Sequence, residues 1–294
     1  MKELRAVAGE KDAGRKIKYF VRGDLQVSYG QFCAMKAIGG LTRNGVRVHA
    51  DALLRPGDEI VVRLPDPGPG KAVLPEPGRV NIVYEDEDLY ILDKDAPLAC
   101  QCTPKQPSGT LENRLYAHFA DVPDFVFRPL NRLDRGTSGL MAAAKHAHAC
   151  QLLQRQLHSP CFVREYLAVV EGALTGEGRI DLPIAKAEGA TVRRAVDFER
   201  GQSAATLYWA LSQGNGRTLV RLRLETGRTH QIRVHMAAIG HPIAGDFLYG
   251  RELNALLGRF ALHSARIELV QPLTRARIEC ASPLPAELRR LMEP

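Results

Sequence analysis

The chain has 294 residues, of which 45% are apolar and 25% charged, and it carries a net charge of +7 with a pI near 9.2. This composition predicts a soluble protein of one large or two ordinary domains, and no run approaches the roughly 18 apolar residues that a membrane span needs. Because the opening residues Met-Lys-Glu-Leu do not resemble a signal peptide, we expect a cytoplasmic protein without membrane contact.

The basic excess is concentrated in the first part of the chain. Residues 1–63 contain 12 Lys and Arg against 7 Asp and Glu, whereas the remainder contains 28 against 26. A basic module beside a nearly neutral body is typical of proteins that bind polyanions. Within it, residues 28–38 predict a short helix that ends at Gly39-Gly40, and residues 46–49 and 60–64 predict strands.

Residues 65–79 divide the chain. They contain five prolines and three glycines, so they cannot sustain a helix or a central strand and are typical of an extended linker. A rigid surface loop within a single domain is the alternative. We therefore predict three parts, with an N-terminal domain over 1–64, a linker over 65–79 and a larger domain over 80–294.

The larger domain has the pattern of an α+β fold. Strands are predicted over residues 80–84, 89–92, 164–170 and 218–225, and a helix over 151–157. Because the strands lack regular βαβ spacing, we expect a mixed or antiparallel sheet.

The six cysteines predict reduced thiols. Only Cys100 and Cys102 are close in sequence, and no second pair supplies the other half of a zinc site. We therefore expect no bound metal.

Residues 132–140 read Arg-Leu-Asp-Arg-Gly-Thr-Ser-Gly-Leu and place Asp134 between Arg132 and Arg135. Opposite charges within a few ångströms lower the pKa of a carboxyl group. An ionised and positioned Asp can act as a nucleophile or a general base.

Two further segments carry candidate functional groups. Tyr166 would share one face of its strand with Arg164, where a tyrosine can stack on a planar ring, although packing is the commoner role. Residues 226–235, Thr-Gly-Arg-Thr-His-Gln-Ile-Arg-Val-His, follow a strand and predict a helix capped by Thr229 that ends at Gly240. His230, Arg233 and Val234 would share a face of this helix. A solvated basic helix start is the alternative.

These segments, in this order, resemble the RluA-type pseudouridine synthases. Residues 131–140 match that family's His-Arg-Leu-Asp and Thr-Ser-Gly-Leu motif except that Asn131 replaces His, and residues 227–235 match its Gly-Arg-Thr-His-Gln-Ile-Arg-Val-His stretch. The strand around Tyr166 and the segments 241–250, 262–264 and 283–285 are also similar, so the resemblance covers about residues 80–290. It implies a catalytic domain with a mixed, mostly antiparallel sheet and flanking helices.

The N-terminal segment separately resembles a small α+β S4-like RNA-binding domain. Residues 41–45 are similar to its Val-x-Val-Asn-Gly turn, although Leu41 and Arg43 replace the two valines, and residues 54–60 are similar to its closing Gly-Asp turn and strand.

The resemblance also implies roles for individual residues. Asp134 would be the catalytic carboxylate, Arg233 its charge partner, and Tyr166 would stack against the uracil ring of a nucleotide flipped out of its RNA. Arg132 would fill the space that the flipped nucleotide leaves. The remaining RNA-binding candidates are Arg135, Arg228 and His230 in the larger domain and Arg43 and Arg47 in the N-terminal one.

We therefore predict a monomeric RNA pseudouridine synthase that needs no cofactor. Ribosomal RNA is the favoured substrate, by analogy with relatives of this two-domain layout, and transfer RNA is the alternative. A non-catalytic RNA-binding or ribosome-assembly protein on the same scaffold would need no buried carboxylate facing a polyanion. A glycoside hydrolase would usually need two catalytic carboxylates, and the sequence nominates one.

Overall fold

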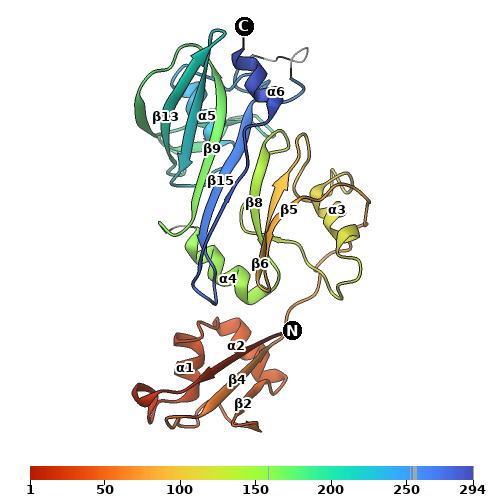
Figure 1. Cartoon of the computed structure of the whole chain (residues 1–294), viewed down its shortest axis with the longest axis vertical. Coiled ribbons are helices and arrows are strands. Elements are labelled where there is room, and N and C mark those ends of the chain that lie inside the picture. Colours follow the sequence, from red (N-terminus) through yellow and green to blue (C-terminus); the bar gives the residue numbers. More distant parts are fainter. Residues whose placement is uncertain (158, 252, 254–256, 294) are drawn as a thin grey trace.

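The computed structural model describes residues 1–157, 159–251, 253 and 257–293, and its strands form two separate main sheets (Figure 1). A four-stranded sheet near the N-terminus lies at one end of the molecule, and a ten-stranded sheet forms the body. Within the described parts of the chain, no helix has both the length and the apolar character to cross a membrane.

Residues 1–64, which we call the N-terminal module, form an antiparallel sheet covered by two helices. The elements are β1 (Lys2–Val7), α1 (Ile17–Gly23), α2 (Tyr29–Ala37), β2 (Leu41–Arg43), β3 (Val46–Arg47) and β4 (Glu59–Leu64), with strand order β1-β4-β2-β3. The helices and sheet enclose a core that includes Phe20, Met35 and Val62. Helix α2 begins where the sequence predicted because Ser28 and Gln31 form a capping box. The strand predicted over 46–49 is shorter in the structure, where β3 ends at Arg47.

Residues 65–81 contain no helix or strand, and hydrogen bonds fasten them to the body. Arg128 Nη2 donates to the Pro67 carbonyl at 2.8 Å, and Asn113 Nδ2 donates to the Leu74 carbonyl at 2.8 Å. The Glu76 carboxylate accepts from a backbone N–H at 2.8 Å. The proline-rich segment therefore follows the surface of the body.

The large sheet confirms the α+β class with a mixed, mostly antiparallel sheet. Its path runs β10-β13-β14-β9-β15-β8-β6-β5, with β16 beside β15 and β7 beside β8. Only the pairing of β8 with β15 is parallel among the described strands. The strands are β5 (Ile82–Glu85), β6 (Leu89–Lys94), β7 (Arg128–Pro129), β8 (Ser138–Ala144), β9 (Val163–Glu171), β10 (Glu177–Asp181), β13 (Ala205–Gly214), β14 (Arg217–Leu224), β15 (Leu262–Val270) and β16 (Arg277–Ala281), and β11 (Ile184–Lys186) pairs separately with β12 (Arg194–Val196).

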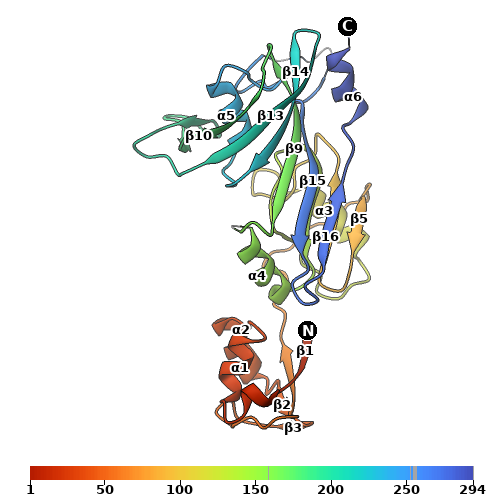
Figure 2. The same ribbon diagram turned by 60° about the vertical axis from the view of Figure 1, so that its left-hand side comes forward.

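Helices cover both faces of this sheet (Figure 2). The helices are α3 (Leu111–His118), α4 (Ala147–Gln156), α5 (Gln231–Ala238) and α6 (Ala286–Arg289). Successive residues of β6 alternate between the two cores: Leu89 packs in the cluster that contains Leu153 of α4, and Tyr90 in the one that contains Leu115 of α3 and Met236 of α5. Helix α4 begins four residues earlier than predicted, because the His146 ring caps it.

Candidate active site

Asp134 lies in the loop between β7 and β8, at one wall of a cleft of about 600 Å³. Its carbonyl accepts a hydrogen bond from Thr137 N at 3.0 Å, which closes a turn and aims the carboxylate at the cleft. The side chain is 28% exposed. The cleft gathers residues from all three segments that the sequence singled out, among them Arg132, Asp134, Arg164, Tyr166, Arg228 and His230.

Arg233 of α5 is the arginine that reaches Asp134. Its Nη1 donates to Asp134 Oδ2 at 3.2 Å, while Nε and Nη2 donate to the two oxygens of Asp246 at 2.7 and 2.8 Å. Burial alone would lower the pKa of Arg233, but the hydrogen bonds and charges of Asp246 and Asp134 raise it above its ordinary value. Arg233 therefore stays charged, and its strongest contact is with Asp246, a residue to which the sequence assigned no role.

Aromatic rings fix the plane of the Arg233 guanidinium. Its central carbon lies 4.2 Å from the centre of the Phe260 ring and 5.0 Å from that of Tyr249. Cations are attracted to the faces of aromatic rings, most strongly where water is excluded. With Asp246 holding two nitrogens, the third is directed at Asp134.

His230 immediately precedes α5 and approaches the same carboxylate. Its backbone is left-handed (φ 59°), its Nε2 lies 3.9 Å from Asp134 Oδ2, and its Nδ1 lies 2.9 Å from the Tyr249 hydroxyl. The predicted cap at Thr229 is wrong, because α5 begins at Gln231 and the Gln231 side chain itself accepts the Arg228 N–H at 2.9 Å. Burial lowers the pKa of His230, although the charge of Asp134 opposes this shift.

Tyr166 lines the cleft from β9, and only 5% of the residue is exposed. Burial raises the pKa of its hydroxyl, which therefore stays protonated at neutral pH. Arg164 lines the same cleft, as their shared strand face predicted. Val234 does not, because it packs with Ile184 and Ala204 in a separate small core.

The Asp134 loop is held from one side by the segment after β6. The buried Lys94 ammonium donates to the Leu98 carbonyl at 2.7 Å, and Leu98 N donates to the Arg135 carbonyl at 2.9 Å. The Cys100 thiol donates to the Leu133 carbonyl at 3.1 Å. Burial lowers the pKa of Lys94 to about 8. These contacts explain why a lysine is buried at the end of β6.

Arg259 holds the same loop from the other side. Its Nη1 donates to the Gly136 carbonyl at 3.0 Å, and its Nη2 bonds Glu287 at 2.9 Å. A side chain at Gly136 would collide with the Phe260 ring, the same ring that packs against Arg233. The position of Asp134 is therefore coupled, through Phe260, to that of Arg233.

The remaining predicted RNA contacts fall into two groups. Arg132, Arg135 and Arg228 are exposed and line the cleft, and Arg228 Nε donates to the Ser203 carbonyl at 3.0 Å. Asn131, at the position where the resembling motif has His, accepts a hydrogen bond from Ala142 N at 3.3 Å through its Oδ1.

The other group lies in the N-terminal module. Arg47 is exposed on β3, whereas Arg43 Nη1 donates to the Leu53 carbonyl at 2.9 Å and lies 3.7 Å from Asp58. Arg43 therefore braces its own module, and Arg47 is free to contact a partner. Among the described residues, no three His, Cys, Asp or Glu side chains are grouped so as to hold a metal ion.

Known proteins share both the sequence and the fold. A family model described as RNA pseudouridylate synthase matches residues 88–238. The chain is 35% identical over 274 residues to an uncharacterised RNA pseudouridine synthase of Bacillus subtilis, YjbO, covering 92% of this chain and 96% of that protein. It is 38% identical over 230 residues to the ribosomal large subunit pseudouridine synthase D of Haemophilus ducreyi, covering 73% and 70%. The solved structure of human RNA pseudouridylate synthase domain containing 1 matches with a TM-score of 0.58 at 27% identity, covering 71% of this chain and 86% of that one.

Proposed function

The chain belongs to the RNA pseudouridylate synthase family, and we propose that it isomerises uridine in structured ribosomal RNA with Asp134 as the catalytic carboxylate. The observation that carries the assignment is the 3.2 Å contact between Asp134 and a buried Arg233, which line one small pocket together with Tyr166. Relatives such as the Haemophilus ducreyi enzyme are named for the large ribosomal subunit, which supports the choice of RNA.

The reaction is a rearrangement within one nucleotide. The bond from uracil N1 to the sugar C1′ breaks, the ring turns, and a bond from C5 to C1′ forms; one proton leaves C5 and one is taken up at N1. Atoms and electrons balance without an added group. Asp134 supplies the carboxylate that attacks the nucleoside or assists departure of the ring, in a site closed to competing water.

Arg233 and Tyr166 act around that step. A uridine in the cleft would displace water from Asp134, which would raise the pKa of the carboxyl unless a cation remained beside it. Arg233, fixed by Asp246, is that cation. Tyr166, neutral and buried, stacks on the uracil and presents its hydroxyl near C5.

The RNA must deliver the uridine out of its stack. Arg132 fills the vacated space, and Arg135 and Arg228 contact phosphates without reading sequence. The basic N-terminal module contacts a second part of the same RNA through exposed cations such as Arg47. We infer that the protein acts as a monomer in the cytoplasm.

A pseudouridine map of RNA from cells lacking the gene tests this proposal. We expect one or a few ribosomal sites to lose pseudouridine, and the parent gene to restore them. Asp134→Asn should bind RNA but restore none of them, whereas Asp121→Asn, at an exposed position, should restore all. Full restoration by Asp134→Asn would refute the assigned carboxylate. Binding by the parent without turnover on ribosomal and transfer RNA would instead favour a non-catalytic RNA-binding protein.

A further inference from the structure

Helix α4 lies at the end of the body that faces the N-terminal module (Figures 1 and 2), and Leu273, in the loop between β15 and β16, packs against the module's core. Gln151 of α4 accepts a hydrogen bond from Ser28 N at 3.2 Å and donates to the Gln26 carbonyl at 3.0 Å. The His148 ring lies 3.3 Å from Gln31 Oε1. These bonds join the start of α2 to one face of α4.

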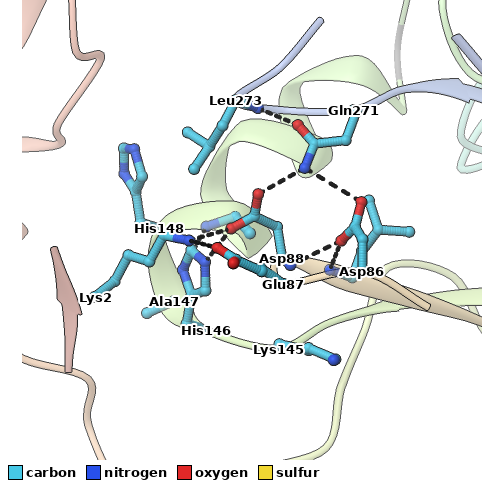
Figure 3. A network of polar contacts seen from close by, with 12 residues as sticks. Lys2, Asp86, Glu87, Asp88, Lys145, His146, Ala147, His148, Gln271 and Leu273 are labelled. Carbon is cyan, nitrogen blue, oxygen red and sulfur yellow. Dashed lines mark hydrogen bonds and ion pairs between the residues drawn. The ribbon is translucent and has the colours of Figure 1, made fainter. Parts of the chain in front are cut away.

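A buried ion pair lies at the edge of this contact (Figure 3). The Asp88 side chain is 4% exposed, and its carboxylate accepts from Lys2 Nζ at 2.6 Å, His146 Nε2 at 2.8 Å and Gln271 Nε2 at 2.6 Å. Asp88, His146 and Gln271 belong to the body, whereas Lys2 is the second residue of the module. Lys2 is therefore the part of this cluster that would leave if the module moved away.

The geometry makes His146 a neutral partner. Ala149 N donates to His146 Nδ1 at 3.1 Å, so Nδ1 carries no proton and the single ring proton lies on Nε2, which donates to Asp88. Gln271 is also neutral. Within the described residues, Lys2 is thus the one full positive charge within 4 Å of the Asp88 carboxylate; Glu87, at 3.7 Å from Lys2, is exposed and acidic.

The segment that follows the module in the chain is hydrogen-bonded to the same helix. Asp66, two residues after β4, accepts a hydrogen bond from Ala147 N, the first residue of α4, at 2.8 Å and pairs with Arg128 at 3.2 Å. The far end of α4 is followed by Leu157, which lines the cleft that contains Asp134. One helix therefore extends from the docked module to the active site.

We propose that Lys2 and Asp88 are positioning residues that lock the N-terminal module onto α4, and that this lock sets a fixed span between the module's RNA-binding surface and Asp134. Undocking would break this ion pair and leave Asp88 with the neutral donors His146 and Gln271 only. Given the RNA-binding function proposed above, an RNA can bind both surfaces at once only if its target uridine and the element bound by the module are separated by that span. The lock would thereby select RNA by shape.

Distance measurements test the lock without reference to activity. Cys33 of α2 and Cys161 of the body are exposed, whereas the other four cysteines are buried or partly buried, so spin labels can be placed on these two. We expect one narrow distance distribution for the parent and a broad one for Lys2→Met. Lys2→Arg should restore the narrow distribution, and Lys11→Met, which removes the same charge from an exposed position of the module, should leave it unchanged.

A second variant guards against a folding defect in the first. Asp88→Asn keeps the shape of the side chain and removes its charge, so it should broaden the distribution as Lys2→Met does. The two changes together should broaden it no further, because they remove one shared interaction. If either single variant kept the narrow distribution of the parent, the lock would be refuted.

Kinetics then test the fixed span. On ribosomal RNA from a strain that lacks the gene, Lys2→Met should raise KM about tenfold and leave kcat unchanged, because loosening a second binding module lowers its effective concentration. On a short stem–loop carrying the same uridine, parent and variant should have equal KM. A loss of kcat on both RNAs would overturn the selective role. If the parent turned over neither RNA, the proposed function would fail, and the distance measurement would still decide the lock.

Discussion

Asp246→Asn tests whether the active-site cation depends on a carboxylate outside the cleft lining. Asp246 is fully buried, accepts two hydrogen bonds from Arg233 at 2.7 and 2.8 Å, and also accepts the Leu248 N–H at 3.0 Å. Removing one partner of a buried ion pair costs about 3–5 kcal/mol, because the other charge stays buried. Asn keeps one acceptor oxygen and nearly the same volume, so we expect a cost of about 3 kcal/mol.

This cost should appear in both stability and rate. A loss of about 3 kcal/mol corresponds to a fall in Tm of about 6–12 °C for a chain of this size, measurable by circular dichroism. Arg233 would keep Asp134 as its remaining carboxylate partner at 3.2 Å, so the two would pair more tightly and Asp134 would be less available to the nucleoside. Single-turnover assays should therefore show a lower kcat. KM should change little, because the buried Asp246 cannot contact RNA.

The matched control is Asp181→Asn. Asp181 also pairs with an arginine, Arg179, but its side chain is 53% exposed. Exposed ion pairs contribute little to stability, so this variant should melt and react like the parent. If Asp246→Asn also behaved like the parent, Arg233 would not depend on its buried partner, and our account of the site would be wrong.

Two further predictions concern buried titratable groups. Tyr166→Phe keeps the ring and removes the hydroxyl, so kcat should fall while KM for RNA stays constant; an unchanged kcat would exclude a role for the hydroxyl. Burial lowers the pKa of His148 to about 4, whereas the unfolded chain takes up this proton below about 6.5. Unfolding therefore binds a proton between these values, and the free energy of unfolding should fall as the pH drops through this window. His148→Gln should flatten the decline of the urea midpoint between pH 7 and 5, and an equally steep decline would contradict the assignment.

The sequence predicted the segments of the site better than the contacts within it. Strand β14 was found because apolar and charged residues alternate along it, and Asp134 was found from its own motif. The local sequence offered its neighbours Arg132 and Arg135 as charge partners, whereas the family resemblance nominated Arg233, and the ion pair in the structure comes from Arg233, 99 residues later. Only the fold brings α5 beside the loop before β8.

Strand β8 shows why some elements were missed. All seven of its residues, Ser-Gly-Leu-Met-Ala-Ala-Ala, are buried, since helices cover both faces of the sheet there. A strand buried on both faces has no apolar and polar alternation, and alanine favours helix. Gly139 adds a further constraint that no local pattern shows, because a side chain there would collide with the Ser264 carbonyl on β15.

A buried carboxylate is paired with a cation at two places in this chain, and we expect different consequences from breaking each pair. Asp246 and Asp88 are both buried carboxylates, each paired with one full cation; Arg233 precedes Asp246 by 13 residues, whereas Lys2 precedes Asp88 by 86. At the active site the pair holds Arg233 against Asp134, so breaking it should lower kcat on any RNA, long or short. At the module the pair holds one RNA-binding surface relative to another, so breaking it should raise KM only on RNA long enough to touch both. A variant that showed the other pattern at either place would show that the two pairs had been assigned the wrong roles.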